Sequence, residues 1–273
     1  MKRIEIKTGN KFTNTRGKTF LQPNQCVMFF ITAFFVFLPG IAFSFDFSEW
    51  DVLLEKYVTP KTISGIQLNG VDYKNLKDDL SFTRLLIRLQ NASLSELKTP
   101  KAKLTFWINV YNILAVKMVL DHYPIKSIKN AGGLFSPVWE KDAGIIGGTP
   151  RTLHEIEHEI LRKTGDPRIH AAIVCASVSC PDLRREAFVE NKIENQLDEQ
   201  IKTFLANPSK GMKIEGNRIY LSKIFKWFEE DFEEKGGVLK FLVLFVSDRN
   251  REKIASGKLE VRHLNYNWSL NGH

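Results

Sequence analysis

Two segments of the sequence carry residue types whose spacing is typical of a chemical site. The segment His154-Glu155-Ile156-Glu157-His158 matches the H-E-x-x-H pattern, in which two histidines one helical turn apart bind zinc and the glutamate activates water. Further along the chain, Cys175 and Cys180 lie five residues apart. A cysteine beside a base is a nucleophile, whereas two cysteines that are close in space form a disulfide in an oxidising compartment.

The zinc interpretation is weakened by the residues around the two histidines. Thr152 and Glu155 fit a capping box at the start of an expected helix from Thr152 to Lys163, with Glu155 folded back onto the amides of the first turn. A carboxylate held there is poorly placed to act as a general base. The position six residues after His158 is Thr164, so a third ligand is missing at that spacing. We therefore expect no metal and no other cofactor, and we keep a zinc-dependent hydrolase as a second alternative.

The cysteine pair follows an apolar run that we expect to be a buried strand from Arg168 to Cys175. Cys175 would then project from the strand end into a cleft built by loops. We assign Cys175 as the candidate nucleophile, His158 on the preceding helix as its base, and Glu157 as an assisting residue. The alternative is a disulfide between Cys175 and Cys180, which would lock the loop between them and leave no free thiol.

The clearest helix is expected from Lys101 to His122, where apolar residues recur every three to four positions along one stripe. Asn109 and Asn112 lie on a different face, where they can orient an imidazole or bind a substrate amide. The alternative for both is a buried hydrogen-bonding pair that fixes the glycine- and proline-rich loop 124–151. Trp107 is either part of the core or a contact for a peptide or sugar beside the cleft.

The remaining patterns predict an α+β fold, namely a helix-rich single domain with a small sheet. Two hairpins are expected, with turns at Asn69-Gly70 and Gly216-Asn217. Further helices are expected at 47–57, 80–89, 193–205, 223–232 and 238–246, and an extended segment at 259–270. Helices and strands do not alternate regularly, which disfavours a doubly wound parallel sheet.

The first 44 residues have the order of a signal peptide. Basic residues precede an apolar run from Val27 to Leu38, and a small-residue pattern then ends at Ser44. We expect cleavage near Ser44 and a single domain over 45–273; the alternative is an uncleaved anchor from Val27 to Phe45. Residues 1–44 hold six Lys or Arg and one Glu, so their removal lowers the formal net charge from +8 to +3. A surface this close to neutral gives no electrostatic case for binding nucleic acid.

Four strings of the sequence resemble a family found in bacteria and plants, called domain of unknown function 547 (DUF547). In chain order within 105–271 they are Phe106–Asn112, Ile156–Arg162, Arg168–Pro181 and Tyr266–Asn271. The resemblance implies a bacterial exported member of a family whose activity is not established. In that family the element around Glu157-His158 is typical, whereas the position of His154 is not. Plant-like members resemble this segment with serine in place of Cys180, which favours Cys175 as the nucleophile.

Two functions follow from these observations. The first is an exported thiol-dependent hydrolase or acyl transferase that uses Cys175 and His158. The second is a non-catalytic binding or scaffold module of the cell envelope. In both cases we expect a periplasmic or secreted protein whose partner is an envelope protein or a peptide-like substrate. We expect contact with a membrane only through the signal segment, if it is uncleaved.

Overall fold

The computed structural model describes residues 45–133 and 137–273, so the predicted signal peptide lies outside the described residues. The described residues belong to one compact unit. Helices predominate within it and the strands form three small sheets, as expected for an α+β fold.

The elements have the following bounds. The α-helices are α1 (Ser48–Tyr57), α2 (Tyr73–Leu76), α3 (Leu80–Gln90), α4 (Pro100–His122), α5 (Ile169–Ala172), α6 (Ile193–Ala206), α7 (Ile224–Trp227), α8 (Val238–Leu242) and α9 (Asp248–Ala255). The strands are β1 (Val58–Ile63), β2 (Ile66–Val71), β3 (Asp142–Ile146), β4 (Thr149–Thr152), β5 (Met212–Glu215), β6 (Arg218–Leu221) and β7 (Glu260–His263). The π-helix is η4 (Glu155–Leu161), and the 3-10 helices are η1 (Leu94–Glu96), η2 (Ile128–Ala131), η3 (Val138–Glu140), η5 (Arg162–Thr164), η6 (Glu190–Lys192) and η7 (Glu229–Lys235).

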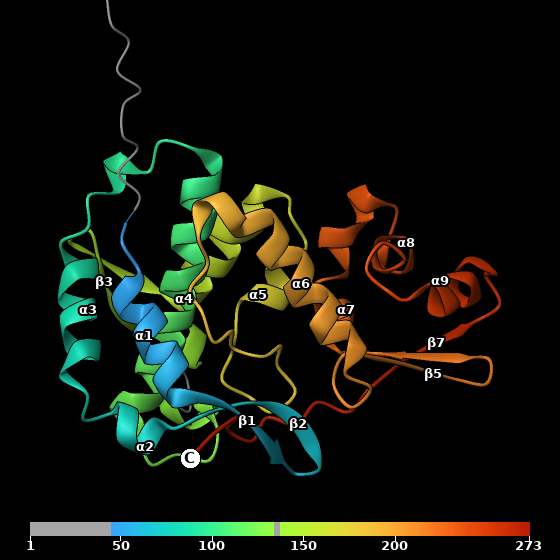
Figure 1. Ribbon diagram of the computed structural model, residues 1–273, viewed down its shortest axis with the longest axis horizontal. Coiled ribbons are helices and arrows are strands. Elements are labelled where there is room, and N and C mark those ends of the chain that lie inside the picture. Colours follow the sequence, from blue (N-terminus) through green and yellow to red (C-terminus); the bar gives the residue numbers. More distant parts are fainter. Residues whose placement is uncertain (1–44, 134–136) are drawn as a thin grey trace, which may run out of the picture. The chain divides into compact units, whose positions relative to one another are not determined.

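The longest helix, α4, begins with a strong capping signal. The Thr99 hydroxyl accepts a hydrogen bond from the Ala102 amide at 2.9 Å, and Pro100 occupies the first turn, where its missing N–H is not needed. The helix runs through the middle of the helical part and contacts β3, η2 and η4 (Figure 1). The single apolar stripe expected for it is wrong, because neighbours bury it on nearly every side. Its length and composition would suit a membrane span, yet most of it is buried inside this protein.

Two asparagines of α4 bond to backbone that belongs to no sheet. The Asn112 side chain accepts a hydrogen bond from the Val174 amide at 2.9 Å and donates one to the Ala172 carbonyl at 2.9 Å. Asn109 makes the same two-way contact with Phe188, at 3.0 Å and 2.9 Å. Both side chains therefore satisfy buried backbone groups, as such groups require.

The strand predicted from Arg168 to Cys175 is wrong. Asp166 accepts a hydrogen bond from the Arg168 amide at 3.0 Å, and the following four residues form the short helix α5. Ile173 then has an extended backbone, and residues 173–175 pair with no strand among the described residues. An apolar run is buried equally well in a strand, a helix or an irregular segment. Here Asn112 supplies the polar partners that a neighbouring strand would have supplied.

The β1–β2 hairpin turns at Ser64 and Gly65, whose φ angles are 53° and 76°. The turn expected at Asn69-Gly70 is therefore wrong, because these residues lie inside β2. The turn expected at Gly216-Asn217 is confirmed, since it connects β5 to β6. Strand β7 then pairs with β6 in parallel.

The C-terminal part is more broken than the sequence suggests. The helix expected over 223–232 stops at Trp227 and is followed by the 3-10 helix η7. The helix expected over 238–246 stops at Leu242, and α9 is not predicted at all. Strand β7 covers only part of the extended segment expected at 259–270.

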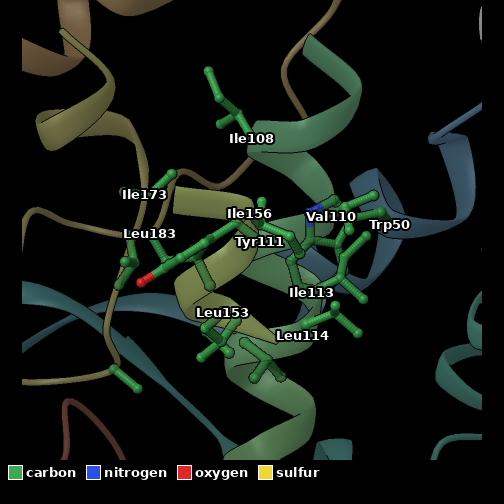
Figure 2. Close-up of a cluster of buried hydrophobic side chains, with 14 of the residues drawn as sticks. Trp50, Ile108, Val110, Tyr111, Ile113, Leu114, Leu153, Ile156, Ile173 and Leu183 are labelled. Atoms are coloured by element: carbon green, nitrogen blue, oxygen red, sulfur yellow. The ribbon is translucent and has the colours of Figure 1, made fainter. Parts of the chain in front are cut away.

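Buried apolar side chains form two clusters. The larger surrounds α4, and Figure 2 shows Tyr111 of that helix extending past Ile156 toward the segment that carries Ile173. The smaller cluster joins α6, α7, α8 and the β5–β6 hairpin. Each cluster keeps its own set of aromatic and aliphatic side chains out of water, which is the main source of stability for such a fold.

The segment Leu264–His273, which we call the C-terminal strap, ties distant parts of the chain together. Its backbone bonds to three residues of the loop after α5, namely Ala176, Val178 and Ser179. Near its end Asn271 accepts a hydrogen bond from the Tyr73 hydroxyl at 2.7 Å, and Gly272 pairs with Val71 of β2. A Cβ on Gly272 would lie 1.9 Å from the Val71 carbonyl oxygen, so only glycine fits there. Figure 1 shows this end of the chain beside the β1–β2 hairpin.

We expect Asn112→Ala to lower the free energy of unfolding by about 3 kcal/mol, because two buried backbone groups lose their partners. Urea unfolding of the two proteins measures the difference. The control is Asn91→Ala, an exposed asparagine that bonds to the Ile87 carbonyl, for which we expect a loss below about 1 kcal/mol. Equal losses for the two variants would contradict the role of Asn112.

Candidate functional site

A small pocket of about 70 Å³ lies where the two clusters meet. Its lining combines two sulfurs, a carboxyl group and an imidazole with aromatic walls, which is the usual make-up of a ligand site. The lining residues are Tyr111, Trp139, Glu157, His170, Ile173, Cys175, Cys180, Ile224, Trp227, Phe228, Tyr266 and Trp268.

Cys175 and Cys180 are joined by a disulfide across a tight loop. Their Cα atoms are 6.3 Å apart, and the Cys175 amide donates a hydrogen bond to Cys180 Sγ at 3.0 Å. Ala176, which follows Cys175, has a φ of 53°, a left-handed conformation that is uncommon for a residue with a Cβ. The two cysteines differ in accessibility, because Cys180 is 3% exposed whereas Cys175 is half-buried.

Tyr266 of the C-terminal strap presents its hydroxyl to both sulfurs. Its Oη lies 3.3 Å from Cys175 Sγ, donates to Cys180 Sγ at 3.4 Å and accepts from Ser177 Oγ at 3.1 Å. Burial raises the pKa of Tyr266 well above its usual range, so the hydroxyl keeps its proton. The pocket therefore holds a permanent hydrogen-bond donor beside the sulfur pair.

Glu157 is the buried carboxyl group of the pocket, with 5% of its surface exposed. It accepts a hydrogen bond from the Tyr111 hydroxyl at 3.0 Å. Burial raises the pKa of Glu157 to about 7, although Tyr111 and Arg162 oppose the shift, and Asp231 adds to it. This carboxyl group therefore gains and loses its proton near neutral pH, which suits a general acid or base.

His170 and Asp231 form a second titratable pair at the pocket. His170 Nε2 lies 2.6 Å from Asp231 Oδ2, and the imidazole stacks on Phe228 with 4.1 Å between ring centroids. Burial lowers the pKa of His170, so the neutral ring donates to the carboxylate. Burial works against ionisation of Asp231, but hydrogen bonds from His170 and Arg162 hold its pKa well below the usual range. The sequence does not single out His170, because a histidine in an apolar run carries no sign of a distant carboxylate partner.

His158, the predicted base, is not among the residues that line this pocket. Its ring stacks on His154 with 4.3 Å between centroids, and its Nδ1 lies 2.7 Å from Arg162 Nη1. Burial, together with His154 and Arg162, lowers the pKa of His158, which favours the neutral ring. Glu157 is the residue of the same segment that reaches the pocket.

The predicted capping box forms only in part. Thr152 accepts a hydrogen bond from the Glu155 amide at 2.9 Å, as expected. The Glu155 carboxylate pairs with Arg151 rather than folding onto the first-turn amides, because a guanidinium offers a stronger, charge-assisted partner. The segment Glu155–Leu161 is a π-helix, a rare form that often occurs at functional sites.

The other predicted binding residues lie outside the pocket. The side-chain amides of Asn109 and Asn112 bond to backbone groups of the protein. Trp107 is buried, and the Arg151 guanidinium lies 5.7 Å from its ring centroid.

Residues 94–205 match the family model described as "Protein of unknown function, DUF547". This match supports the family assignment. No curated protein and no solved structure matches the chain. The matched part of the chain contains Tyr111, Glu157 and both cysteines of the pocket, whereas Tyr266 lies beyond it.

The zinc pattern has no complete ligand set in the part of the chain that the structure describes. Among residues 45–133 and 137–273, no group of three or more His, Cys, Asp or Glu side chains is arranged to hold a metal ion. His154, directly before the π-helix, stacks its ring on that of His158, and the Glu155 carboxylate is paired with Arg151.

Three tryptophans form an aromatic wall along the pocket. Trp227 stacks on Trp268 with 5.7 Å between ring centroids, and Trp139 lies 6.0 Å from Trp268. Lys129 Nζ lies 4.0 Å from the centroid of Trp268. Trp227 is 45% exposed, so part of the wall is open to an incoming apolar or aromatic group.

We expect Glu157→Gln to reduce the pH dependence of stability. The pKa of Glu157 is raised in the folded protein from the ordinary 4.5 to about 7, so folding favours the protonated form. This contribution is complete below about pH 4.5 and is lost as the pH rises toward and through 7, a change of about 3 kcal/mol. Urea unfolding at pH 4.5 and pH 8 measures it, with the exposed Glu159→Gln as control. Parallel pH profiles for wild type and Glu157→Gln would contradict the assignment.

Proposed function

We propose that this chain is an exported thiol-dependent hydrolase or acyl transferase with Cys175 as its nucleophile. The observation that supports it best is the presence of Cys175 and Glu157 in one pocket, with the Tyr266 hydroxyl 3.3 Å from Cys175 Sγ. In such a reaction the sulfur attacks an acyl carbon and takes the acyl group from the leaving group. Water or another nucleophile then accepts the acyl group from the sulfur.

Glu157 is the base that fits this pocket best. A carboxylate with a pKa of about 7 is half deprotonated at neutral pH and is basic enough to draw a proton from a thiol. The Tyr111 hydroxyl donates a hydrogen bond to Oε2 of Glu157, so Oε1 does not take part in this bond. His158 is the second candidate base, because its neutral ring belongs to the same π-helix.

In the disulfide form the Ser177 hydroxyl donates to Tyr266 and the Tyr266 hydroxyl donates to Cys180, and either hydroxyl can turn its proton toward Cys175 once the disulfide is open. Ser177 Oγ and Tyr266 Oη both lie 3.3 Å from Cys175 Sγ. Hydrogen bonds to a charged acceptor stabilise it more than bonds to a neutral one. The arrangement therefore favours the nucleophilic form of the sulfur once the disulfide is open.

The disulfide makes this activity conditional. Sulfur bonded to Cys180 is not a thiolate, so the acyl-transfer reaction requires the reduced form of the protein. Hydrogen bonds from the C-terminal strap to Ala176 and Val178 do not involve sulfur and would hold the loop in the reduced form as well.

A non-catalytic binding module of the cell envelope is the second candidate function. The aromatic wall favours it, because exposed aromatic rings beside a hollow bind apolar groups without any chemistry. Its partner would be an envelope protein or a peptide-like ligand. In that case the disulfide would serve to keep the loop rigid.

We expect the reduced protein to accept one acetyl group from p-nitrophenyl acetate on Cys175, detected by mass spectrometry of peptides. Glu157→Gln should slow this acylation by about a hundredfold, because it removes the proton acceptor. Glu159→Gln should be labelled at the wild-type rate. Slow labelling of His158→Ala, with Glu157→Gln unaffected, would instead identify His158 as the base. An absence of label on Cys175 in the reduced, folded protein would favour the binding module.

We also expect the exported form to begin near Phe45. Expression of the full chain in a bacterium, followed by intact-mass measurement of the periplasmic protein, should give the mass of residues 45–273. A protein that stays in the membrane fraction at its full mass would instead support an uncleaved anchor.

A further inference from the structure

We propose that Cys175 and Cys180 form a dithiol–disulfide exchange pair, with Cys175 as the sulfur that forms the mixed disulfide and Cys180 as the sulfur that leaves. This activity goes beyond the proposed acyl chemistry, because it requires both cysteines and transfers electrons rather than an acyl group. The substrate class is a dithiol, on a protein or a small molecule.

The two sulfurs are unequal in the way that such a pair requires. Cys175 is half-buried and lines the pocket, so an incoming thiolate can approach it. Cys180 is 3% exposed, which shields it from direct attack. Thiol–disulfide exchange depends on which sulfur is attacked and on access to that sulfur.

Hydrogen bonds are already directed at the leaving sulfur. Cys180 Sγ accepts a bond from the Cys175 amide at 3.0 Å and one from the Tyr266 hydroxyl at 3.4 Å. When the disulfide opens, negative charge develops on this sulfur, and both donors then stabilise a thiolate instead of a neutral atom. A better-stabilised thiolate is a better leaving group, so these contacts speed the opening of the bond.

The fold does not depend on the disulfide to hold the loop. The strap binds the loop backbone through Ala176, Val178 and Ser179, and the Cys180 amide donates to the Ser177 carbonyl at 3.1 Å. A disulfide that closes so short a loop also removes little chain entropy. The bond can therefore open and close while the surrounding structure stays in place.

The exchange balances as follows. A thiolate of the dithiol attacks Cys175 Sγ, a new S–S bond forms, and the Cys175–Cys180 bond breaks with its electron pair on Cys180, which takes up a proton. The second thiol of the substrate loses its proton and attacks the substrate's first sulfur, which is bonded to Cys175 in the mixed disulfide. Cys175 leaves as a thiolate and is then protonated. The substrate dithiol loses two electrons and two protons, and the cysteine pair gains them. Glu157, in the same pocket, is the protein group suited to carry a proton at neutral pH.

The first experiment measures the reduction of the oxidised protein by dithiothreitol at pH 7, with trapped thiols counted by alkylation and mass spectrometry. We expect reduction at least about tenfold faster than that of glutathione disulfide under the same conditions, with the far-UV circular dichroism unchanged. A rate equal to or below that of glutathione disulfide, or unfolding on reduction, would overturn the proposal.

The second experiment tests the roles of the two sulfurs. Cys180→Ser treated with glutathione disulfide should accumulate a mixed disulfide on Cys175, at least about tenfold faster than Cys175→Ser forms one on Cys180. Equal rates, or faster reaction at Cys180, would overturn the assignment. The same Cys180→Ser protein keeps a free Cys175, so its acetylation by p-nitrophenyl acetate tests the acyl-transfer proposal independently of exchange.

The third experiment tests the hydrogen bond to the leaving sulfur. Tyr266→Phe should slow reduction by dithiothreitol about tenfold, because a hydrogen bond to a charged acceptor contributes about 1.4 kcal/mol or more. Tyr57→Phe is the matched control, since its hydroxyl bonds to Asp79 outside the pocket, and it should react at the wild-type rate. Equal rates for the two variants, with both folded, would overturn this part of the proposal.

Discussion

Asn109 and Asn112 satisfy the backbone of two irregular segments that lie against α4, and the position of the sulfur pair depends on this constraint. The residues before Cys175 are buried, yet no strand of the described chain pairs with them. Their polar groups would be costly to bury without partners. The Asn112 side chain supplies one donor and one acceptor at the required spacing, and this fixes the direction from which Cys175 enters the pocket.

Removal from water shifts the ionisable groups that line the pocket toward their neutral forms, whereas the neighbouring Asp231 stays charged. Glu157, Tyr111 and His170 are buried and Tyr266 is partly buried, and removal from water favours the uncharged form of each. Asp231 remains charged because Arg162 and His170 both bond to it at the edge. In a pocket with little fixed charge the local dielectric is low, so hydrogen bonds from the Cys175 amide and the Tyr266 hydroxyl to a charged Cys180 sulfur are stronger than they would be in water.

The sequence correctly predicts secondary-structure elements whose signals lie within a few residues. The prediction is wrong where a residue distant in the chain determines the local structure. Thr99 and Pro100 mark the start of α4, and Gly216 marks the β5–β6 turn, because capping and turn chemistry act over a few residues. The run before Cys175 is read as a strand because apolar composition does not distinguish a strand from an irregular segment held by a side chain.

The candidate site shows the same division. Cys175 and Glu157 are selected from the sequence because their types and motif stand out, and both line the pocket. Tyr266 and His170 are missed as site residues because their roles depend on contacts across 91 and 61 positions of the chain. The sequence also does not show which of Glu157 and His158 reaches the pocket, since this depends on the direction in which the π-helix projects each side chain.

Gly272 does not touch the sulfur pair, yet its packing affects the position of Tyr266 beside the two sulfurs. Its contact with Val71 leaves no room for a methyl group, so even alanine would push the end of the strap away from β2. Tyr266 is carried on the same strap and would shift with it. Genetic variation at this one position would therefore change the pocket from a distance, although Gly272 does not line it.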